Sequence, residues 1–147
     1  MKNNFFSVKN EKESSGFLLW QVTTLWQKMI KESLKKHHIT HPQFVVLASL
    51  LWFSSKKESC NQIKLSQHTK IDKATIGEII GKLENKKLLI RKPSDKDKRS
   101  YEITLTKKGF SLVPKAVCEI ESVDFLFFNK LTEQEQESFR KNILKLI

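Results

Sequence analysis

Apolar residues recur at helical spacing in several long stretches of the chain. Between residues 17 and 36, Leu18, Val22, Leu25 and Met29 follow the i, i+4, i+7, i+11 pattern of an amphipathic helix. Residues 44–53 are apolar nearly all round, which predicts a central buried helix. Residues 107–128 and the stretch after residue 132 repeat the amphipathic pattern. The spacing therefore predicts a mainly α-helical protein.

Capping residues in the sequence predict where several helices begin. Thr40 followed by Gln43, and Thr132 followed by Glu135, are capping-box patterns. Pro42 fits the first turn of the helix after Thr40, where a missing N–H costs nothing. We expect two further helix caps, at Asp72 and Thr106.

The stretch 72–109 combines a helix with a hairpin. A short helix over 60–69, with Ile63 and Leu65 pointing inward, is followed by a turn at residues 70–71 and a second helix from Asp72. Two strands are predicted over 88–92 and 101–105, because Tyr101 and Ile103 alternate with polar residues. The polar tip between the strands spans residues 93–100. The pattern predicts a helix–turn–helix with a basic hairpin behind it.

Positive charge is concentrated in the helix–turn–helix and hairpin region. The chain carries a formal net charge of +11, with a pI of about 9.7. Residues 61–109 hold 13 Lys and Arg against 6 Asp and Glu, whereas residues 110–147 hold 5 against 6. Such a distribution indicates a polyanion-binding surface. The alternative explanation is a Lys-rich surface that merely keeps the protein solvated.

A helix followed by a cationic hairpin suits duplex DNA, because the helix fits the major groove and the tip reaches a neighbouring minor groove. The start of the second helix should then meet base edges, and Lys82 should meet phosphate. At the tip, Arg99 should enter the minor groove, with its guanidinium held by the carboxylate of Asp97. The candidate DNA-binding residues are Asn61, Gln62, Lys73, Ala74, Thr75, Glu78, Lys82, Lys96, Asp97, Lys98 and Arg99.

The run DKRSYEITLTKKG at residues 97–109 resembles the DxR…LTxxG wing signature of the MarR (multiple antibiotic resistance regulator) family. Residues 74–76 and 82–84 are similar to the recognition helix of that family. The resemblance implies a mainly α (α+β) fold: a winged helix–turn–helix with a two-stranded β-wing and N- and C-terminal dimerisation helices. It also implies a cytoplasmic bacterial regulator, a homodimer on a pseudo-palindromic operator that is released by a small aromatic ligand or by oxidation.

The predicted organisation is a flexible N-terminal arm over residues 1–15 and a single MarR-like domain over 16–147. Within it, residues 40–105 form the reader, and residues 16–38 and 107–147 the dimerisation helices. The two C-terminal helices carry more apolar surface than a small reader needs, which indicates a dimer interface with the first helix.

Three positions depart from the family pattern. Lys70 and Lys87 stand where the family often has glycine, so a positive φ at either would cost about 1 kcal/mol. Glu78 stands where many members carry a basic or small polar residue. A carboxylate accepts a hydrogen bond from a cytosine amino group, so the operator preference of relatives does not transfer.

Candidate sites for a small molecule or for chemistry are fewer. Four aromatic residues are candidates for lining an aromatic effector pocket where the first two helices meet the reader, although such residues more often belong to a core: Trp20, Trp26, Phe44 and Trp52. The four histidines show no metal-ligand spacing, and we expect them to be solvated or stacked on rings. Cys60 and Cys118 are expected to be buried, inert thiols, the alternative being redox sensors. We expect neither a metal nor a cofactor.

Other classes of protein fit less well. An RNA-binding or ribosome-associated protein would share the charge but would more often show exposed aromatics on a sheet. An enzyme would need a third partner for Cys60 and His68, and no phosphate-binding loop is present. The N-terminus is polar and no apolar run reaches 18 residues, so we expect no membrane association. A DNA-binding transcriptional regulator, most consistent with a repressor, is the interpretation that the sequence favours.

Overall fold

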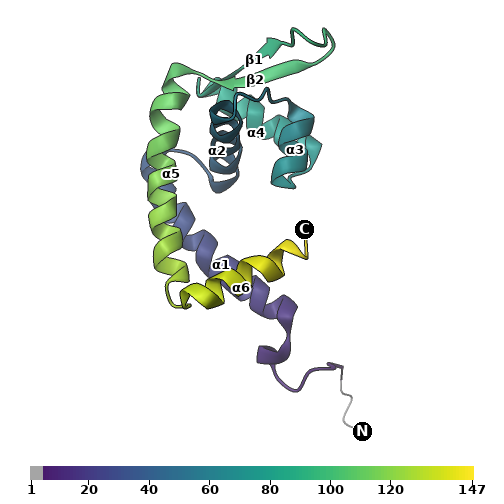
Figure 1. The fold of residues 1–147 in the computed structure, drawn as a ribbon, viewed down its shortest axis with the longest axis vertical. Helices are drawn as coiled ribbons and strands as arrows, with labels where there is room; N and C mark the ends of the chain where they lie inside the picture. The colour runs from purple at the N-terminus through teal and green to yellow at the C-terminus, as the bar shows by residue number, and fades with distance from the viewer. Residues whose placement is uncertain (1–4) are drawn as a thin grey trace.

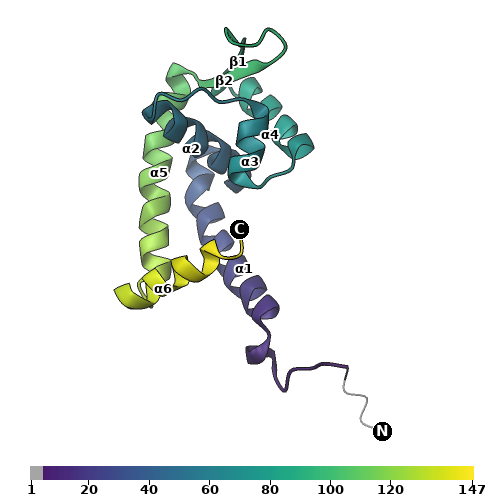
Figure 2. The same cartoon turned by 45° about the vertical axis from the view of Figure 1, so that its right-hand side comes forward.

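The computed structural model describes residues 5–147 and has two parts (Figure 1). The reader lobe contains α2 (His41–Ser55), α3 (Gln62–Thr69), α4 (Lys73–Asn85), β1 (Leu89–Pro93) and β2 (Tyr101–Leu105). Away from it run α1 (Ser15–Leu34) and α5 (Lys107–Phe128) side by side, and α6 (Glu133–Leu144) turns back from the end of α5 (Figure 2). Short 3-10 helices η1 (Glu11–Glu13) and η2 (Lys35–His37) flank α1. The predicted winged helix–turn–helix fold is confirmed.

The caps place the helix starts as predicted. Thr40 and Thr132 form complete capping boxes, and the hydroxyl of Thr106 accepts from the N–H of Gly109 at 3.1 Å. As a result α5 has the bounds that its sequence predicts. The N-terminal arm is shorter than predicted, because Ser14 caps α1 and residue 15 is already helical. Residues 1–4 of that arm lie outside the described residues.

Two boundaries and one side chain differ from the prediction. Helix α3 begins at Gln62 rather than at Cys60, because Asn61 is its cap and accepts from the Lys64 N–H at 2.8 Å. Ile63, predicted to point inward, is 52% exposed. Strand β1 begins one residue later than predicted, because the N–H of Leu88 bonds the Leu83 carbonyl at 3.0 Å in the turn that closes α4.

The two lysines at family glycine positions do adopt a positive φ. Lys70 (φ 62°) ends α3, and Lys87 (φ 59°) follows the end of α4. Both are in the left-handed conformation that commonly ends a helix, which costs a non-glycine residue about 1 kcal/mol. Hydrogen bonds from their N–H groups to Ser66 and Glu84 offset part of that cost. The helix–turn–helix therefore keeps the geometry of a glycine turn with lysine side chains facing solvent.

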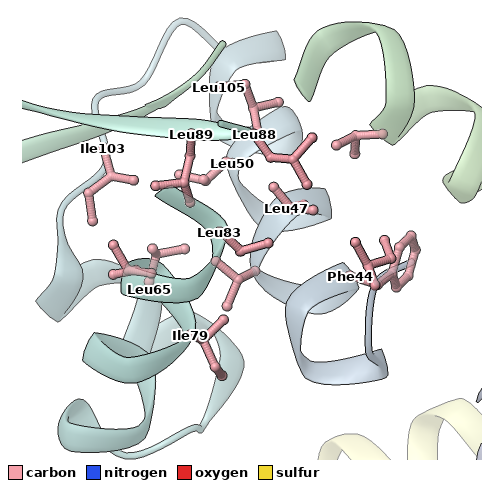
Figure 3. Close-up of a cluster of buried hydrophobic side chains, with 14 of the residues drawn as sticks. Phe44, Leu47, Leu50, Leu65, Ile79, Leu83, Leu88, Leu89, Ile103 and Leu105 are labelled. Atoms are coloured by element: carbon pink, nitrogen blue, oxygen red, sulfur yellow. The ribbon is translucent and has the colours of Figure 1, made fainter. Parts of the chain in front are cut away.

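The core joins the reader helices to the root of the wing (Figure 3). Leu47 and Leu50 of α2 lie beside Leu83 of α4, and Leu89 and Leu105 close the cluster from the two strands. Antiparallel pairing sets Leu89 opposite Leu105, so one apolar rung anchors both strands. The predicted buried helix over 44–53 is correct for most positions, but Trp52 is 56% exposed. The wing thus projects from a rigid base.

The first turn of α5 is pressed against the end of α4 at Gly109. A Cβ added to Gly109 would lie 2.2 Å from the Leu88 carbonyl oxygen, which is backbone and cannot easily yield. Gly109→Ala should therefore lower the free energy of unfolding by about 1–3 kcal/mol, the usual cost of overpacking. Urea denaturation measures the change. Gly16→Ala is the matched control, because its Cβ meets nothing within 4 Å; equal midpoints for the two variants would contradict the packing.

Candidate nucleic-acid interface

Helix α4 presents one polar face to solvent and one apolar face to the core. Ile76, Ile80 and Leu83 are fully buried. The predicted reading residues lie on the opposite, exposed side: Lys73, Ala74, Thr75, Glu78 and Lys82. Because a helix alternates its faces with a period of 3.6 residues, burying the isoleucines holds this polar set outward.

The start of α4 is fixed by a cap that also engages Thr75. The carboxylate of Asp72 accepts from the backbone N–H of Thr75 at 2.9 Å and from its hydroxyl at 2.6 Å. These bonds hold the pKa of the Asp72 carboxyl below its ordinary value. The hydroxyl hydrogen of Thr75 is therefore committed, and its oxygen remains free to accept. That oxygen suits a base amino group, which is a donor.

Asn61 and Gln62, both predicted to bind DNA, form bonds inside the helix–turn–helix. The Oδ1 of Asn61 accepts the α3 cap bond from the Lys64 N–H. The Nε2 of Gln62 donates to the Lys73 carbonyl at 3.0 Å and so ties α3 to the first turn of α4. Both residues are half-buried. Asn61 therefore fixes the start of α3, and Gln62 holds α3 against α4.

The wing tip is ordered by backbone hydrogen bonds, and one predicted contact is wrong. Asp97 Oδ1 accepts from the backbone N–H of Arg99 at 3.0 Å, and Ser94 Oγ accepts from two tip N–H groups. Within the described residues no ion pair joins Asp97 to the Arg99 guanidinium. Asp97 shapes the turn instead, because its short side chain reaches the N–H two residues on. Arg99 and the neighbouring lysines Lys96 and Lys98 are left exposed.

A charged fork that the sequence did not reveal joins the wing to α4. The Arg91 guanidinium on β1 donates to both carboxylate oxygens of Glu84, over 3.3 and 3.1 Å. The fork holds the pKa of the Glu84 carboxyl below its ordinary value. No periodicity or motif signals a pair seven residues apart across a helix end and a strand. The turn between α4 and β1 places the strand beside the end of the helix and so brings the two side chains together.

One groove brings the candidate residues of three elements together. It runs between the start of α3, the start of α4 and the base of the wing. Its lining includes Asn61, Gln62, Lys73 and Arg99, with Arg91 and Tyr101 between them. The groove thus joins the start of α4, at Lys73, to the wing, at Arg99. The other predicted reading residues of α4 do not line it but are exposed on the same helix: Ala74, Thr75, Glu78 and Lys82.

Comparisons with known proteins agree with this geometry. The family described as transcriptional regulator SarA/Rot matches residues 28–116. The chain is 31% identical over 134 residues to YdcH of Bacillus subtilis, an uncharacterized HTH-type transcriptional regulator, covering 91% of this chain and 90% of that one. A mutant of Escherichia coli MarR, solved in complex with operator DNA, superimposes with a TM-score of 0.82 at 21% identity, covering 97% and 99%. The chain belongs to the MarR family.

A further solved structure is similar over nearly the whole chain. Bordetella bronchiseptica BpsR, whose DNA binding is regulated by 6-hydroxynicotinic acid, superimposes with a TM-score of 0.84 at 26% identity, covering 95% of this chain and 96% of that one. The predicted class, a DNA-binding transcriptional regulator of the MarR family, is confirmed.

The four aromatic candidates for an effector pocket do not converge in this MarR-family chain. Phe44 is buried in the core, and Trp20 is 69% exposed on α1. Trp52, also exposed, lies beneath the ammonium of Lys56, 4.8 Å from its ring. Trp26 alone approaches the α1–α2 junction: it donates to Asp124 at 2.8 Å and meets the His41 ring edge-on at 5.1 Å.

A cleft of about 730 Å³ opens beside Trp26, between α1, the α2 start and the turn after α3. Its size suits a small molecule. The sequence predicts an effector pocket where the first two helices meet the reader, and this cleft lies there, but none of the four aromatic candidates is among its lining residues. Its lining residues are Gln27, Lys31, Lys35, Ile39, Thr40, His41, Pro42, Val45, Thr69 and Ile71.

The histidines and cysteines can be compared with their predicted environments. His41 and His68 stack edge-on against Trp26 and Phe53, as expected. His37 differs from the expectation, because its Nε2 lies 3.0 Å from the Glu119 carboxylate on α5. Cys60 is buried, and its desolvation raises the pKa of the thiol to about 12. Cys118 is exposed on α5, so its predicted burial is wrong. Cys118 lies off the buried stripe of α5, which contains Val113, Ala116 and Ile120.

Membrane spans and metal clusters are both lacking over residues 5–147. No helix there is long and apolar enough to cross a membrane. No group of three or more His, Cys, Asp or Glu side chains in this part of the chain is arranged to hold a metal ion.

Proposed function

We propose that this chain is a repressor that acts as a homodimer on a pseudo-palindromic operator. Helix α4 enters the major groove, and the wing tip enters the adjacent minor groove. The observation that carries the proposal is the shared surface of α3, α4 and wing, with Lys73 and Arg99 lining one groove. Lys96 and Lys98 flank Arg99 as phosphate contacts, and Lys82 contacts phosphate beside α4. In a bacterium such a regulator works in the cytoplasm, where the chromosome is.

Uncovered apolar surface on the long helices supports the dimer. Only Ile30 and Leu34 of α1 are fully buried within the chain. The first half of α1 instead exposes a run of large apolar side chains, as does the end of the chain: Phe17, Leu18, Leu19, Trp20, Val22, Leu25, Phe125, Leu126, Ile143, Leu144, Leu146 and Ile147. Soluble monomers rarely expose so much contiguous apolar surface. A second copy of the same helices covers it in an isologous interface.

The alternative partner, structured RNA, is tested by competition. At one fixed salt concentration, a gel shift should show the protein retained on a mixed-sequence DNA duplex in the presence of excess structured RNA. The deep, narrow major groove of A-form RNA does not admit a helix, so α4 has no place there. Preferential capture by the RNA would contradict the proposed function.

The reading role of Thr75 leads to a sequence-selective prediction. Thr75→Ala removes an acceptor at the start of α4, so operator affinity should fall by about 1 kcal/mol, with the change confined to one base position per half-site. Lys82→Ala is the control, because a phosphate contact weakens all sequences alike and reduces the salt slope by about one. Binding titrations against single-base operator variants measure both. A sequence-selective loss at Lys82 with a uniform loss at Thr75 would reverse the two roles.

An effector of the aromatic carboxylate class fits the cleft beside Trp26. Burial lowers the pKa of His41, so its ring is neutral at pH 7. Lys31 supplies positive charge, whereas the ammonium of Lys35 is already paired with Glu32 at 2.7 Å. Apolar walls at Ile39 and Val45 accept an aromatic ring. A ligand bound here would act on the junction of α1 and α2, through which the reader lobe joins the dimerisation helices.

Aromatic carboxylates should therefore quench tryptophan emission and weaken operator binding together, since linkage makes the two effects reciprocal. Trp26→Phe should remove most of the quenching, because Trp26 borders the cleft through His41. Trp52→Phe, on an exposed part of α2 away from the cleft lining, should leave the quenching intact. Fluorescence titration decides between them. Quenching that depends on Trp52, or none across a broad panel, would contradict an effector in this cleft.

A further inference from the structure

Helix α4 contains two glycines within 13 residues, Gly77 and Gly81. A glycine inside a helix destabilises it by roughly 0.5–1 kcal/mol relative to alanine. Neither glycine has a positive φ, so the backbone conformation does not require them. We therefore ask, for each glycine, what the space left by its missing side chain allows.

The packing of α3 against α4 explains the glycine at position 77. A Cβ at this position would lie 3.1 Å from the Nε2 of Gln62. That amide passes over Gly77 to donate to the Lys73 carbonyl, the bond that ties α3 to α4. The missing side chain at Gly77 makes room for the contact between the two helices.

No contact within the described chain explains the glycine at position 81. A Cβ built there meets nothing within 4 Å, so alanine would fit without any contact. The position lies on the exposed side of α4: residues 74, 78 and 81 follow the i, i+4, i+7 spacing, and Ala74 and Glu78 are both exposed. Gly81, itself half-buried, thus leaves open space where a side chain would stand on this side of α4, at a cost to helix stability.

We propose that Gly81 is a positioning residue for DNA reading. Its missing side chain lets the α4 backbone approach the duplex closely, and this depth brings the Glu78 carboxylate within reach of a base amino group. This inference rests on the proposed function, because it takes α4 to be the element in the major groove. A methyl group at position 81 holds the helix away from the duplex and withdraws Glu78 from the base edge.

The test uses two helix-favouring substitutions of increasing size, Gly81→Ala and Gly81→Leu. Both should raise the midpoint of urea denaturation or leave it unchanged, since alanine and leucine favour helices. Operator affinity should nevertheless fall about tenfold for alanine, as expected for one lost base contact, and further for leucine. The discrimination between operators that differ at the base read by Glu78 should shrink in the same order.

Gly16→Ala is the matched control, because its Cβ also meets nothing within one chain and it lies outside the reader; sedimentation checks that this variant, at the start of the dimerisation helix, has the oligomeric state of the wild type. It should change stability in the same direction with no effect on affinity. Unchanged affinity and unchanged base discrimination in both Gly81 variants would overturn the inference while leaving the proposed function intact. Failure of the wild-type protein to prefer duplex DNA would overturn the proposed function and this inference with it.

Discussion

Replacing Leu25 by glutamate should turn the dimer into a folded monomer that has lost tight operator binding. Leu25 lies on the α1 stripe with Leu18, Val22 and Met29, and its side chain is 60% exposed within one chain. The substitution therefore removes little from the core of a single chain, and glutamate is as good a helix former as leucine. In a dimer interface, by contrast, the carboxylate is buried without a partner, which costs several kcal/mol.

The effect on DNA binding follows from the number of half-sites held at once. A dimer binds its second half-site as an intramolecular step, and losing that step lowers affinity by roughly 10²- to 10⁴-fold. Sedimentation at micromolar concentration should give about twice 17.2 kDa for the wild type and 17.2 kDa for Leu25→Glu. Leu25→Ala is the matched control, because it removes the same side chain from the α1 surface without adding a charge and should weaken the dimer less than Leu25→Glu does. A monomeric wild type that binds the operator tightly would contradict the dimer.

Removing the wing arginine should have the next largest effect. Arg99→Ala should lower operator affinity by about 1–3 kcal/mol, mostly at A·T-containing flanks, because a guanidinium enters a narrow minor groove more easily than an ammonium. Stability should not change, since the tip is exposed and lies outside the core. Lys98→Ala, at a neighbouring exposed position, should chiefly flatten the dependence of affinity on salt.

The bond between Asp97 and the Arg99 N–H adds a further distinction. Asp97→Ala should reduce affinity less than Arg99→Ala does, because the guanidinium remains but the turn that carries it is loosened. Titrations of operator DNA at two salt concentrations measure all three variants. Equal affinities for wild type and Arg99→Ala at both salt concentrations would mean that the wing is only a scaffold.

Features that depend on neighbouring residues could be predicted from the sequence. A helix cap is complete within four residues, so Thr40, Thr106 and Thr132 mark the starts of α2, α5 and α6 correctly. Alternation along the second strand correctly indicates that Ile103 and Leu105 face the core, whereas the pairing of Leu105 with Leu89 also depends on the turn. The positive φ of Lys70 could be expected because a tight turn between two helices imposes it.

Features that depend on tertiary contacts could not be predicted in the same way. An aromatic residue at helical spacing has the same pattern whether it is buried like Phe44 or exposed like Trp20. From the sequence, the Asp97 carboxylate could bond either the backbone N–H or the guanidinium of Arg99. Only the geometry of the turn selects the N–H. Nothing in the sequence indicates that the Gln62 amide bonds the Lys73 carbonyl, because this bond exists only when α3 and α4 are packed together.

The most direct test of the account is selection of bound duplexes from a random DNA library by the wild-type protein. Two copies of the chain, each reading with α4 and the wing, should enrich an inverted repeat whose half-sites lie about one helical turn apart, ~10 base pairs. A·T pairs should be enriched at the flanks, where Arg99 enters the minor groove. Enrichment of a single asymmetric half-site, or no enrichment over the starting library, would contradict a homodimer that reads DNA through this surface.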